Sequence, residues 1–228
     1  MKIFILTLFP EMFQGTFDHS IVKRAIDKGL VTIKLINIRD FGIGKHKVVD
    51  DKPFGGGTGM IFRVDVVNKA ISKIKDKKLK IEDQKIILLT PSGKTFNQKI
   101  AENFSRLKHL ILVCGHYEGF DKRVEKFVDE KISVGDFITT GGEIPAMLIT
   151  DTVVRLIKGT LKEGVVNKES FSPYLEYPQY TKPRRFKNLN VPKILLSGNH
   201  KKINNWQNTQ SLNYTIKSRP DLLEKGVR

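Results

Sequence analysis

Residues 133–147 have the sequence SVGDFITTGGEIPAM, which predicts the end of a strand, a glycine-rich turn and the start of a helix. Such a turn is typical of phosphate sites, because a helix N-terminus carries free N–H groups and a positive dipole end. This turn has Asp136 before the glycines and Glu143 after them, and it contains no lysine. Two carboxylates disfavour a phosphate and favour a cationic ligand. For Glu143 alone, an acid matched to the helix dipole is the simpler interpretation.

Outward from this turn, strand patterns alternate with helix patterns, which predicts a parallel α/β sheet covered on both faces. The expected strands are 3–9, 31–38, 85–90, 109–115 and one leading into the turn, and the expected helices are 18–28, 64–76, 96–104, 121–128 and 144–158. Ligands bind such sheets at the carboxyl ends of strands. The loops 90–94, 114–121 and 135–143 are therefore expected to converge on one pocket.

Two of the remaining segments have the composition of binding loops. Residues 114–123, CGHYEGFDKR, offer glycines for close backbone approach, the stacking ring of Tyr117, and Glu118. Arg123 is expected to pair with Glu118 or Asp121. Residues 50–60, DDKPFGGGTGM, predict a mobile loop in which an aspartate reads a base edge while the preceding basic residues hold phosphate. A plain long loop is the alternative.

The charge is concentrated toward the C-terminus. The chain has 40 Lys and Arg against 24 Asp and Glu, a net charge of +16, and residues 178–228 contribute +9 of it. A lysine-rich organism could produce a general excess of positive charge, but drift would spread it evenly. The pattern favours a face that meets nucleic acid. We expect a first domain at 1–159, a linker at 160–177, and a basic domain at 178–228 with two short helices separated near Arg219.

Other features restrict the class of protein. The single cysteine, Cys114, permits no internal disulfide, which favours the cytoplasm. The apolar start, residues 3–9, predicts a buried strand and not a signal peptide, and no run is long enough for a membrane span. The five histidines form no zinc-binding pattern.

Taken together, the motifs resemble those of the TrmD-type tRNA (guanine-N1)-methyltransferases, a bacterial branch of the SPOUT methyltransferases. The resemblance spans essentially the whole chain. It rests on LFPEMF, HKVVDDKPFGGGTGM, LTPSGK, LILVCGHYEGFDKRV, SVGDFITTGGEIPAM, SFSPYLEYPQYTKP, VPKILLSGNH and SRPDLL. So many motifs in one order are more specific than any single glycine-rich turn.

The resemblance implies a parallel α/β domain with a deep trefoil knot, a small, mostly helical C-terminal domain that binds tRNA, and a homodimer with active sites at the subunit interface. It also implies that S-adenosylmethionine, whose sulfonium is a cation, lies in the knot. The implied contacts are Leu88, Leu89, Pro91, Gly115, Tyr117, Glu118, Val134, Gly135, Asp136, Phe137, Ile138, Thr139, Gly141, Gly142 and Pro145.

The implied reaction is methyl transfer to N1 of the guanine just 3′ of the anticodon. By similarity the catalytic residues are Glu169 as general base, Arg155 as the cation that stabilises O6, and Glu118; Asp50, Gly59 and His116 would bind the substrate. Glu169 stands where the family usually has Asp, and His116 where Arg is common. The family also suggests a magnesium requirement, although the sequence shows no dedicated metal cage.

Three alternatives remain open on the sequence. A ribose 2′-O-methyltransferase would share the knot without needing the acidic base. A basic RNA-binding protein without chemistry would account for the charge but not for three glycine-rich loops. A nucleotide-dependent dehydrogenase is more distant, because the dinucleotide fingerprint is absent.

Overall fold

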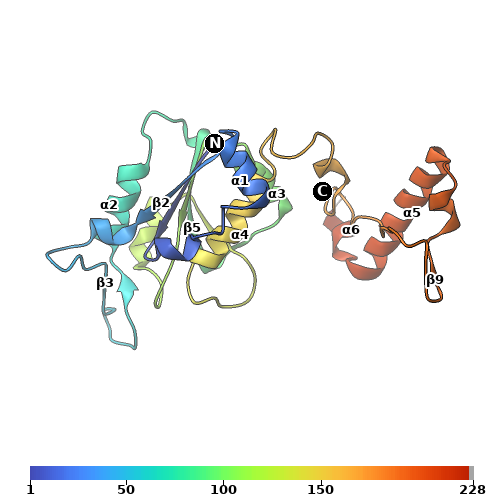
Figure 1. Ribbon diagram of the computed structural model, residues 1–228. Helices are drawn as coiled ribbons and strands as arrows, with labels where there is room; N and C mark the ends of the chain where they lie inside the picture. Colours follow the sequence, from blue (N-terminus) through green and yellow to red (C-terminus); the bar gives the residue numbers. More distant parts are fainter. Residues whose placement is uncertain (226–228) are drawn as a thin grey trace. The chain divides into compact units, whose positions relative to one another are not determined.

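A computed structural model describes residues 1–225, apart from the side chains of Lys168, Glu224 and Lys225. The chain divides into two compact units, Met1–Leu161 and Lys162–Arg228, which are described separately (Figure 1). The predicted linker at 160–177 is therefore grouped almost entirely with the second unit.

The first unit is built on a five-stranded sheet in the order β2-β1-β6-β5-β7, in which every neighbouring pair is parallel. The α/β class predicted from the sequence is thus confirmed. The trefoil knot stays a prediction. The strands are β1 (Lys2–Thr7), β2 (Thr32–Asn37), β5 (Gln84–Thr95), β6 (His109–Val113) and β7 (Glu130–Ser133).

Alternate residues of the central strands face opposite sides of this sheet, and each side has its own apolar core. Ile3, Ile5, Leu110 and Leu112 belong to one cluster, whereas Leu6 belongs to the other. Helices cover both faces, so the sequences of the central strands β1 and β6 are nearly continuously apolar.

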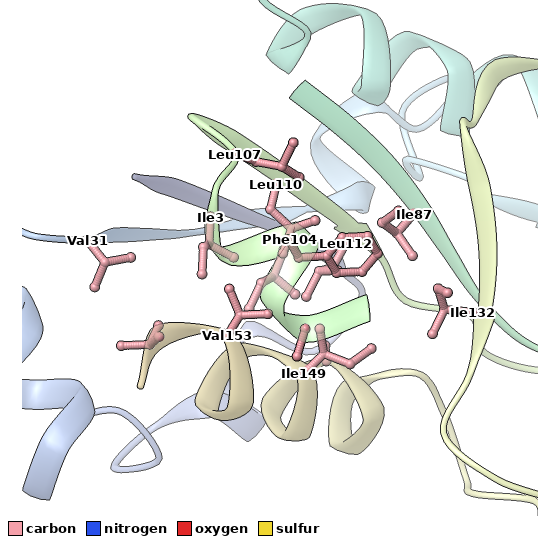
Figure 2. Close-up of a cluster of buried hydrophobic side chains, with 14 of the residues drawn as sticks. Ile3, Val31, Ile87, Phe104, Leu107, Leu110, Leu112, Ile132, Ile149 and Val153 are labelled. Carbon is pink, nitrogen blue, oxygen red and sulfur yellow. The ribbon is translucent and has the colours of Figure 1, made fainter. Parts of the chain in front are cut away.

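The helices divide between the two faces. The first cluster is completed by α1 (Ser20–Asp27), α3 (Gln98–Ser105) and α4 (Glu143–Val154). In Figure 2, Phe104 of α3 and Ile149 and Val153 of α4 lie under the sheet. The second cluster is completed by α2 (Val64–Ile74) and by two 3-10 helices, η2 (Ile38–Phe41) and η4 (Lys122–Phe127). The helix expected at 121–128 is therefore a 3-10 helix, started by the Asp121 side chain, which accepts a hydrogen bond from the Arg123 N–H. Two further 3-10 helices are η1 (Pro10–Phe13) and η3 (Ile81–Asp83).

The glycine-rich loop predicted at 50–60 is anchored at its base. Two short antiparallel strands, β3 (Asp50–Asp51) and β4 (Ile61–Phe62), pair Asp50 with Phe62. Arg63 forms ion pairs with Asp51 at 3.3 Å and Asp65 at 2.9 Å, and its guanidinium lowers the pKa of Asp65. The loop tip therefore extends from a fixed stem.

The second unit contains η5 (Val166–Lys168), the hairpin β8 (Arg185–Phe186) and β9 (Leu189–Asn190), η6 (Lys193–Leu196), α5 (His200–Ser218) and α6 (Asp221–Lys225). The prediction of two short helices was wrong, because the first of them, α5, is 19 residues long and ends at Arg219. Leu175, in the predicted linker, donates its N–H to Thr215 Oγ1 and accepts a hydrogen bond from Ser211 Oγ. Part of the expected linker is thus tied to α5.

Candidate active site

A cavity of about 430 Å³ lies at the carboxyl ends of the central strands of the first unit. Residues of the loops after β6 and β7 line it, together with Thr90, Pro91 and Ser92 of β5. These are the three segments expected to converge, and the structure brings them together. The volume falls within the range of small-molecule sites.

Most residues predicted to contact a cofactor line this cavity. They are Leu88, Leu89, Pro91, Gly115, Tyr117, Glu118, Val134, Phe137, Ile138, Thr139, Gly141, Gly142 and Pro145, and His116 joins them. Gly135 and Asp136 of the same prediction do not line it, and Asp136 is exposed. The carboxylate of Asp136 therefore does not face the cavity as the sequence suggested.

The other predicted residues belong to different elements. Asp50 lies in β3 and Gly59 in the glycine-rich loop. Arg155 caps the C-terminus of α4 through its N–H, which bonds to Asp151 O at 3.2 Å. Glu169 follows η5 in the second unit and is partly buried.

Close backbone contact forms one wall of the cavity. The Gly142 N–H donates to Gly115 O at 2.7 Å. A Cβ on Gly142 would lie 2.7 Å from both Cys114 Cα and Gly115 N, where no carbon fits. The turn after β7 is therefore pressed directly against the loop after β6, and only glycine permits that approach.

A cluster of three rings, Phe9, His116 and Tyr117, lies beside this wall. The His116 ring lies between Phe9, at 4.8 Å, and Tyr117, at 4.9 Å. Tyr117 has a φ of +57°, a left-handed conformation that an aromatic residue rarely adopts. Backbone strain of this kind is common at binding sites, where the surrounding structure enforces it. His116, Tyr117 and Glu118 all line the cavity.

The C-terminal end of the glycine-rich loop and β4 also contact this segment. The Glu118 N–H donates to Met60 O at 3.1 Å, and Phe62 N–H donates to Gly119 O at 2.9 Å. Gly59 has a φ of +88°, and a Cβ there would lie 2.9 Å from Glu118 Oε1. Gly59 therefore packs against Glu118, which brings one predicted substrate residue next to one predicted catalytic residue.

Part of the cavity lining was not predicted from the sequence. Lys122 and Lys131 both pair with Glu125, at 2.8 and 3.0 Å, and these contacts lower the pKa of the Glu125 carboxyl. Lys122 and Glu125 line the cavity, as does Phe120, which stacks on Phe62 at 5.0 Å. The sequence at 121–128 predicted only an ordinary helix. Nothing in it distinguished Lys122 and Glu125 from charged residues that are exposed to solvent. Of the two partners expected for Arg123, the structure selects Asp121, at 2.6 Å.

The burial of Glu143 was also not predicted from the sequence. It begins α4, as expected of an acid matched to a helix dipole, but it is only 1% exposed. Its Oε1 accepts a hydrogen bond from Thr7 Oγ1 at 2.7 Å, which links α4 to the end of β1. A buried carboxylate needs such partners, because its desolvation is costly. Nearby Cys114 is buried as well, and burial together with the Glu143 charge raises the pKa of its thiol.

Among the described side chains of residues 1–225, no group of three or more His, Cys, Asp or Glu is arranged to hold a metal ion. In the same range, no helix combines the length and apolar character needed to cross a membrane.

The backbone contact at Gly142 can be tested by a single added methyl group. Replacing Gly142 with Ala forces the turn away from Cys114, at a cost of about 1–3 kcal/mol typical of overpacking. We expect a lower melting temperature and weaker binding of S-adenosylmethionine, the ligand that the sequence resemblance implies, both measured by calorimetry.

Gly15→Ala is the matched control, because Gly15 has a φ of +76° but open space around it. It should destabilise the fold through backbone strain while cofactor binding stays unchanged. Equal affinity in both variants would contradict a role for the 142–115 contact in shaping the cavity.

Comparison with known proteins assigns the family. The family model for tRNA (guanine-1)-methyltransferase TrmD matches residues 1–225. A tRNA (guanine-N(1)-)-methyltransferase of Dictyoglomus turgidum is 54% identical over 227 residues, covering 99% of this chain and 91% of the relative. Enzymes of that name from Carboxydothermus hydrogenoformans and Staphylococcus epidermidis are 53% and 50% identical, covering 98% and 99% of this chain and 88% and 91% of their own lengths. The chain therefore belongs to the TrmD family of tRNA (guanine-1)-methyltransferases.

Proposed function

We propose that this protein transfers a methyl group from S-adenosylmethionine to N1 of the guanine just 3′ of the anticodon, position 37 of tRNA. The observation that carries the proposal is the cavity where three loops meet at the carboxyl ends of the sheet, in a chain whose full-length relatives are named for this methylation. Such an enzyme acts where tRNA is used, so we place it in the cytoplasm.

The cavity suits an adenosine derivative. Its walls combine apolar side chains such as Leu88 and Val134 with the backbone of Gly141 and Gly142, which carry no side chain of their own. Such a lining can enclose an adenine and offer it backbone hydrogen bonds. S-adenosylmethionine supplies an electrophilic methyl group on a sulfonium, and the Glu118 carboxylate at the cavity favours that positive charge.

The chain must supply a base and a cation. Guanine N1 carries a proton and is a poor nucleophile, so a carboxylate has to remove that proton as N1 attacks. We assign this role to Glu169. Negative charge then moves toward O6, and we assign its stabilisation to the Arg155 guanidinium. Asp50, Gly59 and His116 are assigned to binding the guanine. We name no residue as a magnesium ligand.

The proposal is tested by transfer of labelled methyl to two tRNA transcripts, with guanine or adenine just 3′ of the anticodon. Only the guanine transcript should be labelled, at N1. Replacing Glu169 with Gln removes the base and should lower the turnover rate by roughly 10²–10⁴-fold. Glu169→Asp, which restores the usual family residue, should retain activity.

The affinities for tRNA and S-adenosylmethionine separate loss of chemistry from loss of binding, and we expect Glu169→Gln to leave both unchanged. Equal labelling of both transcripts, or full activity of Glu169→Gln, would instead indicate the ribose methyltransferase. Tight tRNA binding with no labelling at all would indicate a binding protein without chemistry.

We also propose that the second unit binds the tRNA backbone. Its hairpin carries Arg185 and Lys187 beside two exposed apolar side chains, Phe186 at 60% and Leu189 at 74% exposure. Lys187 Nζ lies 5.7 Å from the centre of the Phe186 ring. Cations that contact phosphate next to an aromatic ring that stacks on a base are typical of single-stranded RNA recognition.

Replacing Arg185 with Ala should weaken tRNA binding and reduce the slope of log affinity against log salt by about one, as for the loss of one phosphate contact. Filter binding at several salt concentrations measures both quantities. Lys73→Ala, an exposed basic residue of α2 in the first unit, is the control and should change neither. An unchanged salt slope in Arg185→Ala would argue against a phosphate contact at the hairpin.

We further propose a homodimer in which each active site is completed by the other subunit. Helix α4 exposes Ile144 (52%) and Leu148, one turn apart on one side, and the neighbouring turn exposes Ile138 at 80%. Apolar side chains gathered next to a binding cavity are typical of an interface.

Replacing Leu148 with Asp should convert the dimer to a monomer of 26.0 kDa in sedimentation and abolish methyl transfer. Ile81→Asp, at another exposed apolar residue near the amino end of β5, should leave the dimer intact. A wild-type chain that sediments as a monomer would refute this part of the proposal.

A further inference from the structure

Two buried polar atoms near the cavity have no hydrogen-bond partner among the described residues. One is Glu143 Oε2, on the carboxylate whose other oxygen is bound by Thr7. The second is Nδ1 of the His116 ring. Unpartnered polar atoms in a protein interior are costly and therefore uncommon, so each requires an explanation.

The two atoms face the same space. A Cβ built on Gly141 would lie less than 3.0 Å from both Glu143 Oε2 and His116 Nδ1. Both atoms therefore lie on the side of Gly141 where a Cβ would be, and any larger residue at 141 would occupy that space. A carboxylate oxygen accepts hydrogen bonds, and an imidazole nitrogen can donate one. Glu143 Oε2 and His116 Nδ1 can therefore form a hydrogen bond with each other.

Further contacts fix the positions of both side chains, Glu143 and His116. Thr7 Oγ1 accepts the Phe9 N–H at 2.9 Å and donates to Glu143, so the carboxylate is anchored to the end of β1. The His116 ring packs between Phe9 and Tyr117, while the residue is partly exposed and lines the cavity. The buried nitrogen thus lies toward Glu143 while part of the residue remains accessible from the cavity.

We propose that Glu143 is a positioning residue that accepts the Nδ1–H of His116 and so fixes the orientation of the imidazole. In the structure the two atoms share the space beside Gly141 without bonding, and the proposed bond brings them into hydrogen-bond distance there. The nitrogen that a histidine presents to a ligand is set by the hydrogen bond that its other nitrogen makes. With Nδ1–H on Glu143, Nε2 is the nitrogen that meets the substrate base. This inference rests on the proposed binding of guanine by His116.

The tautomer of His116 gives a direct test on the unaltered chain. Ring nitrogen shifts are measured by NMR on ¹⁵N-labelled full-length protein with S-adenosylhomocysteine bound, and His116→Asn assigns the signals. The proposal predicts a proton on Nδ1. A proton on Nε2 with a bare Nδ1 would overturn it, and methyl transfer to guanine would still stand as a separate result.

Kinetics of Glu143→Gln give a second test. The amide keeps the shape and the Thr7 bond but presents an N–H to Nδ1, so the Nδ1–H tautomer loses its acceptor. We expect kcat/KM for tRNA to fall about tenfold, the scale of one hydrogen bond to a charged group, with KM for S-adenosylmethionine changed by less than about twofold. Glu82→Gln, an exposed acid paired with Lys80, is the control and should change neither constant.

The double variant distinguishes positioning from general support of the fold. If Glu143 acts through His116, then Glu143→Gln in a His116→Asn background should add less than about a twofold loss. The same tenfold loss in both backgrounds would mean that Glu143 supports only the fold, and would overturn the inference. The tautomer measurement does not depend on any Glu143 variant folding.

Discussion

The contact between Gly142 and the Cys114–Gly115 backbone is the constraint on which the candidate site depends. One hydrogen bond of 2.7 Å and the absence of two side chains let the turn after β7 lie against the loop after β6. Helix α4 begins at the next residue, so the same contact sets where that helix starts. A shift of this turn would move the cavity wall, the buried Glu143 and the first turn of α4 together.

Helix α4 shows how the fold combines packing with an accessible surface. Its residues are apolar on nearly all sides, and seven of the twelve are buried. Ile149 and Val153 pack under the sheet, whereas Ile144 and Leu148 remain exposed on the isolated chain. A helix that is apolar all round is expected to be covered all round. A second copy of the chain would satisfy that expectation, which is why we connect α4 with dimer formation.

The sequence predicted the sheet well because parallel strands buried on both faces leave a strong apolar signal. The meeting of the loops followed from that, since parallel strands end at one edge. Helix α5 was harder. It is polar on nearly all sides and lacks the apolar stripe that predicts a helix. The sequence therefore did not indicate a single helix of 19 residues. The burial of Glu143 left no signal either, because a helix-start acid has the same sequence whether it faces solvent or Thr7.

The second unit poses a different physical problem, because charge rather than burial dominates it. Among its described side chains only Thr215 is fully buried, so it has no apolar core comparable to those of the first unit. The Leu175 N–H donates to Thr215 Oγ1, and the Leu175 carbonyl accepts from Ser211 Oγ, so these two bonds hold the chain to α5 instead. Its positive charges repel one another until counter-charge is supplied. A polyanion such as the tRNA backbone would relieve that repulsion, so stability and substrate binding would increase together in this unit.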